Sequence, residues 1–145
     1  MPTIREITSV ETYAVRHPVL RPGKPVETCR FDGDDLHSTT HFGLFDDDTL
    51  AGVASLFQAP HPGFNEPKQF QLRGMAVLED FQGNGFGDML VEAAEDQTRR
   101  AAGTLVWFNA REKAIGFYEK AGYKITGKPF TIGDIGIHYV MFKRL

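Results

Sequence analysis

The chain has 145 residues, of which 41% are hydrophobic and 24% are charged, and its formal net charge is -3. These values are ordinary for a soluble globular protein, and the length favours one domain that spans residues 1–145. The charge gives no electrostatic reason to expect a nucleic acid or a membrane as partner, and no apolar run approaches the length of a transmembrane helix.

The N-terminal segment predicts a strand followed by a helix. Residues 1–6 lack the apolar core of a signal peptide, so we expect a cytoplasmic protein. Thr3 to Ile7 alternates as a strand does, and Ser9 is a plausible N-cap for a helix that begins at Val10. Pro18 is expected to kink or end this helix, and residues 22–25 to stop it. The side chains expected to face the core are Tyr13, Ala14, Val19 and Leu20.

Residues 27–40 form the least regular stretch. The acidic cluster within Phe31–His37 suggests either a solvated turn or a calcium loop. The calcium interpretation is disfavoured because the glutamate that closes a twelve-residue calcium loop is absent. Cys29 is the only cysteine, so we expect an inert thiol, no internal disulfide and no cysteine metal site.

A hairpin is expected next, from strands at 40–45 and 50–57 that are joined by the polar turn 46–49. Residues 59–67 contain three prolines and a glycine, and they predict a loop. This loop is either a substrate-side loop or an ordinary connection.

The most informative stretch predicts a strand, a glycine loop and a helix. Gln71–Leu78 is apolar enough for a strand, 79–81 forms a turn, and the loop Gln82-Gly83-Asn84-Gly85-Phe86-Gly87 follows. Apolar residues then recur at helical spacing from Phe86 to Ala101, and Gly103 is expected as the residue just beyond the helix.

Such a loop suits an anion. Glycines allow positive φ and close approach of a ligand, and the first amides of a helix have no partners within the helix. The alternative is a tight turn without a ligand. Two other phosphate motifs do not match, because Asp88 occupies the third glycine position of the Rossmann pattern and the loop lacks the Gly-Lys-Ser/Thr ending of a P-loop.

The remaining chain predicts one buried strand, one helix and two final strands. Leu105–Phe108 is continuously apolar, as in a strand buried on both faces, and it ends at Asn109. A short helix carries an apolar face and stops at Gly122. The last strands are expected at 123–129 and 137–142, joined by 130–136. The expected apolar face of the helix is Ala114, Phe117, Tyr118 and Ala121.

Two of these stretches resemble motifs of the GNAT superfamily of acyl-CoA-dependent N-acyltransferases. Gln82, Gly85 and Gly87 match its Gln/Arg-x-x-Gly-x-Gly/Ala loop. Asn109 and the Phe-Tyr-Glu-Lys-x-Gly-Tyr run at 117–123 match a second motif one helix and one strand later. The resemblance implies an α/β (α+β) three-layer fold, with a mixed, mostly antiparallel, twisted sheet of six to seven strands flanked by about four helices.

Two flanking stretches are similar to the ElaA-like branch of that superfamily. They are Asp32–Leu36 with His41 after it, and the late run 136–139. The proline usual before the late histidine is Ile137 here.

The resemblance implies direct transfer of an acetyl group from acetyl-CoA (coenzyme A) to a primary amine of a small molecule or peptide, with no metal. Backbone groups of Met75, Ala76 and Val77 would pair with the pantetheine arm and supply an oxyanion donor, and Asn109 would hydrogen-bond the arm. Asn109 is alternatively a helix N-cap. Asn84 stands where many relatives have a basic residue. The residues that would hold the pyrophosphate are Gln82, Gly83, Asn84, Gly85, Phe86 and Gly87.

Tyr118 matches the family tyrosine that protonates the departing thiolate. A tyrosine has an ordinary pKa of about 10, above the value of about 8.5 for a thiol, so it stays a donor at neutral pH. The general base is open among His41, His138, Glu27, Glu112 and a water chain. A non-catalytic acyl-CoA sensor of the same fold is the main alternative function, and an unrelated nucleotide-binding domain is a third. Exposed strand edges are compatible with a homodimer.

Overall fold

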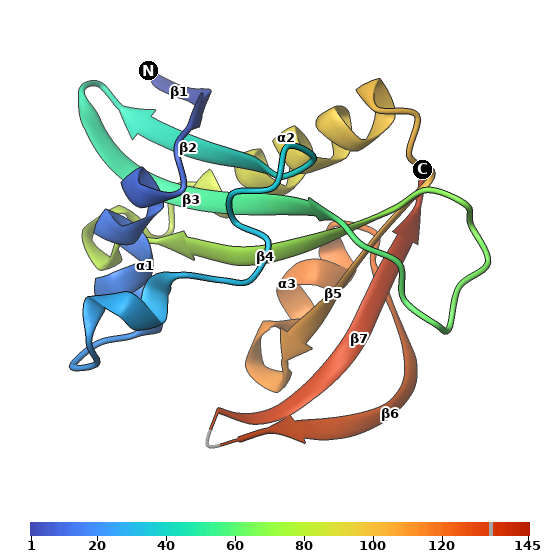
Figure 1. The fold of residues 1–145 in the computed structure, drawn as a ribbon. Coiled ribbons are helices and arrows are strands. Elements are labelled where there is room, and N and C mark those ends of the chain that lie inside the picture. The colour runs from blue at the N-terminus through green and yellow to red at the C-terminus, as the bar shows by residue number, and fades with distance from the viewer. Residues whose placement is uncertain (134) are drawn as a thin grey trace.

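The computed structural model describes residues 1–133 and 135–145, which form one seven-stranded sheet with helices on both faces (Figure 1). The strand order is β1-β2-β3-β4-β5-β7-β6, and all neighbours are antiparallel except β4 and β5. The strands are β1 (Pro2–Ile7), β2 (Thr40–Asp46), β3 (Thr49–Gln58), β4 (Gln69–Val77), β5 (Leu105–Arg111), β6 (Lys124–Ile132) and β7 (Gly136–Arg144). The α-helices are α1 (Tyr13–Leu20), α2 (Phe86–Arg100) and α3 (Ile115–Lys120), with 3-10 turns η1 (Val10–Thr12), η2 (Val26–Cys29), η3 (Glu79–Phe81) and η4 (Glu112–Ala114).

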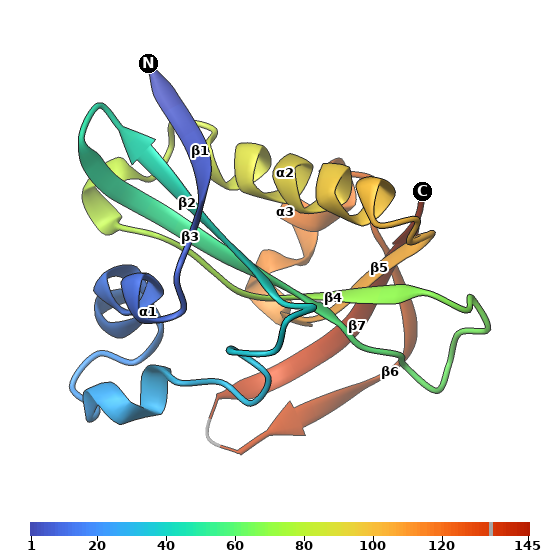
Figure 2. The same cartoon turned by 45° about the horizontal axis from the view of Figure 1, so that its top comes forward.

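The sheet is the middle of three layers, as expected. Figure 2 shows α2 and α3 on one face and α1 on the other. The larger core lies under α2, where Leu90 and Ala94 pack against Leu44, Leu56 and Val106 of the sheet. A smaller cluster joins Val15 of α1 to the opposite face. The mixed, mostly antiparallel sheet is confirmed, although the described residues form three α-helices rather than about four.

The N-terminal helix differs from its prediction in its start and in the face it buries. Residues 10–12 form a 3-10 turn, and α1 begins at Tyr13 and contains Pro18 near its end. Val19 and Leu20 pack against the smaller core cluster, as predicted. Ala14 is exposed, whereas Val15 and Arg16 are fully buried. The prediction assigned the inward face by hydrophobicity alone. It missed Arg16 because that burial depends on polar partners from distant segments.

The end of α2 uses a different residue from the predicted Gly103. Ala102 takes the left-handed conformation with φ 62°, and its N–H donates to Arg99 O while Gly103 N–H donates to Thr98 O. This pair of bonds is a Schellman motif, in which Ala102 is the first residue past the cap. Gly103 is needed for space instead, because a Cβ atom there would lie 2.6 Å from the ring of Phe70.

Two strands run further than predicted. β5 continues past Asn109 to Arg111 because β7 pairs with it along its whole length. β6 continues to Ile132, so the connection to β7 is shorter than the predicted loop 130–136, of which Asp134 lies outside the described residues. No helix in residues 1–133 or 135–145 is long and apolar enough to cross a membrane.

Candidate active site

A cleft of about 370 Å³ opens where β4 and β5 part. The two strands pair in parallel only from Gln69 with Leu105 to Gln71 with Trp107, and then diverge (Figure 1). Beyond that point, β4 from Leu72 to Met75 and β5 from Phe108 to Arg111 line opposite walls of the cleft. The edge of β4 that faces the cleft therefore has backbone groups without a neighbouring strand.

A β-bulge in β4 marks the middle of this wall. Val53 of β3 pairs with Ala76 while Ser55 pairs with Arg73, so β4 has one residue more than β3 over this interval. Gly74 lies in the bulge with φ 62°, a conformation that side chains disfavour. Of the three predicted cofactor residues on β4, Met75 lines the cleft, whereas Ala76 and Val77 pair with β3 and lie beyond it.

The glycine loop presents a row of free amides at the start of α2. Gly83 and Gly85 have φ of 83° and 78°, and Gly85 is the N-cap of α2 without a side-chain cap bond. Within the described residues, no hydrogen bond is made by the backbone N–H groups of residues 83–88. The amides of Gln82 and Asn84 instead fix the loop, since their side chains donate to Val77 O and Phe81 O at 3.0 Å each. These free donors lie at the positive end of α2, which suits an anion.

The last two residues of the loop, Phe86 and Gly87, pack against the rest of the protein. Phe86 is buried in the core under α2. Gly87 lies against α3, because a Cβ atom there would lie 3.1 Å from Phe117 Cζ. The helix that carries Tyr118 is therefore close to the start of α2.

Asn109 and Tyr118 both line the cleft, from β5 and α3 respectively. Asn109 is exposed, and the caps of η4 and α3 are Arg111 and Ala114, so the interpretation of Asn109 as a helix cap is wrong. Tyr118 is half-buried against Phe108, with ring centroids 4.3 Å apart. Among the described residues, neither side chain has a hydrogen-bond partner, so both keep their polar groups available for a ligand.

The surroundings of Tyr118 keep its hydroxyl protonated. Burial raises the pKa of Tyr118 to about 12, because the phenolate would lose its hydration. Its hydroxyl is therefore a proton donor throughout the physiological range.

Of the four side chains considered as general base, His138 lines the cleft. It lies on β7 opposite Arg111, and its Nδ1 is 2.9 Å from Gly136 O. A carbonyl only accepts, so Nδ1 carries the proton and Nε2 is the acceptor nitrogen of the neutral ring. Glu27 and Glu112 are exposed outside the residues that line the cleft.

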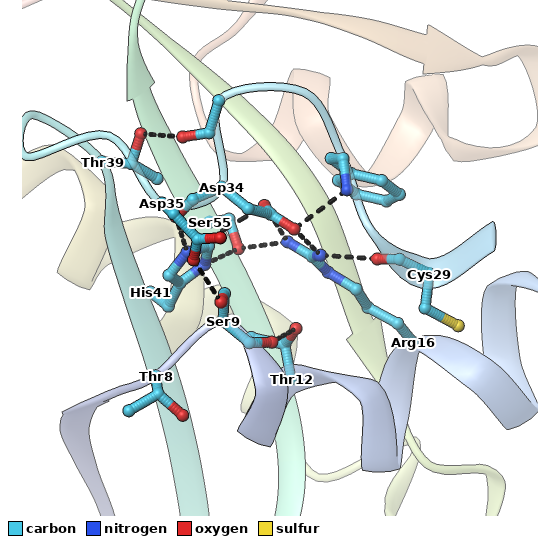
Figure 3. Close-up of polar contacts among 12 residues, drawn as sticks. Thr8, Ser9, Thr12, Arg16, Cys29, Asp34, Asp35, Thr39, His41 and Ser55 are labelled. Carbon is cyan, nitrogen blue, oxygen red and sulfur yellow. Dashed lines mark hydrogen bonds and ion pairs between the residues drawn. The ribbon is translucent and has the colours of Figure 1, made fainter. Parts of the chain in front are cut away.

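His41, on β2, lies instead in a buried polar network with Asp34 and with Ser55 of the neighbouring strand β3 (Figure 3). Its Nε2 is 2.8 Å from Asp34 O, and its Nδ1 is 2.6 Å from Ser55 Oγ. Both ring nitrogens are thus occupied within the protein. His41 therefore has a structural place and lies outside the cleft lining.

The centre of that network is an ion pair between Arg16 and Asp34, whose side chains are 0% and 2% exposed. The two guanidinium nitrogens of Arg16 donate to the two carboxylate oxygens of Asp34 at 2.7 and 3.0 Å. Arg16 also donates to Cys29 O at 2.8 Å and to Ser55 Oγ at 2.9 Å, as Figure 3 shows. The expectation of a solvated turn is thus wrong for Asp34, although Asp32 and Asp35 beside it are exposed.

The network also sets the ionisation of Asp34. Burial alone would raise its pKa, but hydrogen bonds from Arg16 and the Phe31 N–H, together with the charge of Arg16, outweigh burial. The pKa of Asp34 is therefore below its ordinary value, and the carboxylate is charged in the folded protein.

The sequence analysis did not predict three of the residues that line the cleft: Phe31, Arg73 and Arg21. The ring of Phe31 lines the cleft, with the guanidinium carbons of Arg16 and Arg73 at 3.9 and 4.8 Å from its centroid. Arg73 lies in a stretch of β4 where polar and apolar residues alternate. A side chain that faces solvent would give the same pattern, so the pattern did not identify Arg73 as a cleft residue. Arg21 ends α1, and only the fold brings it to the cleft.

The loop of residues 59–67 lies away from the cleft and packs on the other end of β5. Ala59 O accepts a hydrogen bond of 2.8 Å from Trp107 Nε1, and Phe64 packs against Phe142. None of its residues lines the cleft, which favours the interpretation as an ordinary connection.

Comparisons with known proteins match this chain to one family and one fold. The model of the acetyltransferase (GNAT) family matches residues 3–123. "Uncharacterized N-acetyltransferase YitI" of Bacillus subtilis (strain 168) is 37% identical over 142 residues, which cover 98% of this chain and 95% of the relative. The crystal structure of Escherichia coli ElaA has a TM-score of 0.75 at 19% identity and covers 99% of each chain. A GNAT family acetyltransferase from Elizabethkingia anophelis with acetyl-CoA bound has a TM-score of 0.70 at 17% identity, over 99% of this chain and 98% of that one. At these identities the two structures show a shared fold.

Proposed function

The chain belongs to the GNAT family of acetyltransferases and is an N-acetyltransferase, and we propose that it transfers acetyl from acetyl-CoA directly to a primary amine of a small molecule or peptide. The observation that carries the proposal is the separation of β4 from β5 after Gln71. It leaves a free strand edge between a row of unpartnered amides and a protonated tyrosine.

Acetyl-CoA fits this arrangement along its length. We propose that the amides of residues 83–88 bind the pyrophosphate and that the free edge of β4 near Met75 pairs with the amide groups of the pantetheine arm. Asn109 on the facing wall would hydrogen-bond the same arm. The Elizabethkingia anophelis structure, which has the same fold and holds acetyl-CoA, supports acetyl-CoA as the ligand.

In the proposed reaction, the amine nitrogen attacks the thioester carbonyl carbon, the C–S bond breaks, and an amide and a thiol form. A backbone N–H in the β4 bulge near Met75 would stabilise the charge on the carbonyl oxygen. Tyr118 would donate its proton to the departing sulfur, which suits a hydroxyl that burial keeps protonated.

We propose His138 as the group that removes the proton from the attacking amine. Its Nε2 is the acceptor nitrogen of the neutral ring, and the residue lines the cleft. An amine must lose a proton to attack, and a base within reach of the cleft supplies that step.

The proposal is tested by measuring thiol release from acetyl-CoA with a broad amine panel. Tyr118→Phe should lower kcat by about 10²- to 10⁴-fold, the usual contribution of a positioned acid, with little change in CoA affinity by calorimetry. Tyr13→Phe on α1 is the matched control, because Tyr13 is a half-buried tyrosine outside the cleft lining. An unchanged rate in Tyr118→Phe would remove this residue from the role of acid.

The panel also separates the alternatives. Tight CoA binding without transfer to any amine would favour the acyl-CoA sensor over the enzyme. Preference for ATP or NAD over CoA would refute the assignment of the glycine loop.

A further inference from the structure

The charge of the cleft identifies a class of acceptor. We propose that the acceptor amine carries an anionic group, a carboxylate or a phosphate, and that Arg73 is its principal partner. This inference rests on the proposed acetyl transfer, and it names the substrate class for the same site.

Arg73 is a half-buried cation with aromatic neighbours but, among the described residues, no anionic partner within 4.0 Å. Its guanidinium lies over the rings of Phe31 and Phe57, at 4.8 and 5.2 Å from their centroids, and it lines the cleft. Within the described part of the chain, the guanidinium of Arg73 makes no ion pair within 4.0 Å and no hydrogen bond. Burial lowers the pKa of Arg73, and the charges of Arg16 and Arg21 lower it further, against opposing effects from Asp34 and Asp32. An unpaired charge held in this way is stabilised when a ligand supplies the opposite charge.

The other charged side chains that line the cleft are also positive. Arg21 lines it from the end of α1, and Arg111 and Lys113 line it from the end of β5 and from η4. None of the described residues that line the cleft is aspartate or glutamate. The chain as a whole has a formal net charge of -3, so its overall charge does not explain this concentration of cations in the cleft.

Arg16 does not belong to this set, because Asp34 neutralises it beneath the cleft floor. The ring of Phe31 lies between this buried pair and the open cations, within 6 Å of the guanidinium carbons of Arg16, Arg21 and Arg73 at 3.9, 5.7 and 4.8 Å. It offers a flat apolar surface beside the charges.

The proposed pyrophosphate site does not account for Arg21 and Arg73. The proposed pyrophosphate site is the loop at 82–87, and none of its residues lines the cleft. Arg21 and Arg73 lie on the opposite side, near α1, and His138 lies with them at the same cleft. An amine bound near His138 in this cleft would therefore share it with Arg73.

The test compares pairs of amines that differ only in the anion. Glycine, alanine and glutamate are compared with their α-amides, and phosphoethanolamine with ethanolamine, with spermidine as a cationic acceptor. The amino acids and their amides test whether the site recognises a carboxylate. Phosphoethanolamine and ethanolamine test whether it recognises a phosphate. We expect the anionic member to have the higher kcat/KM, even though the α-amides have the more readily deprotonated amine.

Arg73→Gln should lower kcat/KM for the anionic amine by about 10- to 100-fold, the loss expected for a hydrogen bond to a charged group, and leave the KM for acetyl-CoA unchanged. Arg73→Lys should recover part of the loss because it restores the charge. Arg100→Gln on the exposed end of α2 is the control, and it should retain the kinetics of the parent. Raised salt should weaken the preference for the anion.

Each outcome decides the inference. Preference for the neutral amides or for spermidine would overturn it while leaving acetyl transfer intact. If no amine is acetylated, binding of N-acetylglycine and N-acetylglycinamide is compared by calorimetry. Tighter binding of the acid that is lost in Arg73→Gln would support the anion site although the proposed reaction fails, and equal or absent binding would overturn the site as well.

Discussion

Removing the carboxylate of Asp34 tests the buried network most directly. Asp34→Ala deletes an acceptor that takes three hydrogen bonds, from both terminal nitrogens of Arg16 and from the Phe31 N–H at 2.9 Å. The guanidinium would then remain at 0% exposure without its counter-charge. Breaking a buried pair in this way typically costs about 3–5 kcal/mol, because one charge is left uncompensated. Native stability is typically about 5–15 kcal/mol, so the loss is a large fraction of the whole.

The assay is urea unfolding at pH 7, followed by circular dichroism with fitted m-values. Asp32→Ala is the matched control, because it removes an exposed carboxylate two residues away and should change stability by no more than about 0.5 kcal/mol. The double variant Arg16→Met/Asp34→Leu should recover most of the loss, since apolar replacement of both partners is often neutral or stabilising. A loss below about 1 kcal/mol for Asp34→Ala at an unchanged m-value would refute the reasoning.

The same carboxylate predicts a pH dependence with a definite sign. The pKa of Asp34 is lower in the folded protein than the value of about 3.9 expected for the unfolded chain. Its contribution to stability is therefore fully present above that unfolded value and is lost as the pH falls through the folded pKa. Asp34→Asn should flatten this part of the acid-unfolding curve, and an unchanged curve would show that other groups dominate it.

Two further predictions concern other parts of the fold. Burial raises the pKa of the Cys29 thiol, so a disulfide reagent should react slowly with the native protein and faster as denaturant is added; rapid labelling of the native protein would contradict this. Gly103→Ala should destabilise the protein by about 1–3 kcal/mol in urea, because the new Cβ would lie 2.6 Å from Phe70, whereas Gly116→Ala has open space and should not; equal effects would contradict the packing argument.

Elements with a local signal were predictable from the sequence. The alternation of β1, the polar turn between β2 and β3, and the long apolar stripe of α2 each need only neighbouring residues to specify them. The glycine loop was also predictable, since positive φ at Gly83 and Gly85 is a local property. The roles of these residues in binding remain predictions.

Features that depend on distant partners were not predictable from local pattern. A charged residue on a short helix usually faces water, and the burial of Arg16 depends on Cys29, Asp34 and Ser55, which lie 13 to 39 residues away. The extension of β5 to Arg111 similarly depends on pairing with β7. The chemical identity of Arg73 was visible, but its place in the cleft follows from the divergence of β4 and β5.

The buried network and the cleft meet at Gly74, which links the stability of the N-terminal third to the site. A Cβ atom at Gly74 would lie 2.8 Å from the Phe31 ring and 3.2 Å from Arg16 Nε, so the bulge of β4 is enclosed by α1 and the segment after η2. Among the described residues, Arg16 Nε is the one buried side-chain polar atom without a hydrogen-bond partner, and it is the Arg16 atom nearest to that position. The bulge lies between Arg73 and Ala76, on the wall of the cleft. Asp34 of the ion pair accepts a hydrogen bond from the Phe31 N–H, so the pair also positions the ring that packs against this wall. The segment that sequence patterns describe least well is therefore part of the framework of the cleft, because the charge pair rather than regular secondary structure holds it in place.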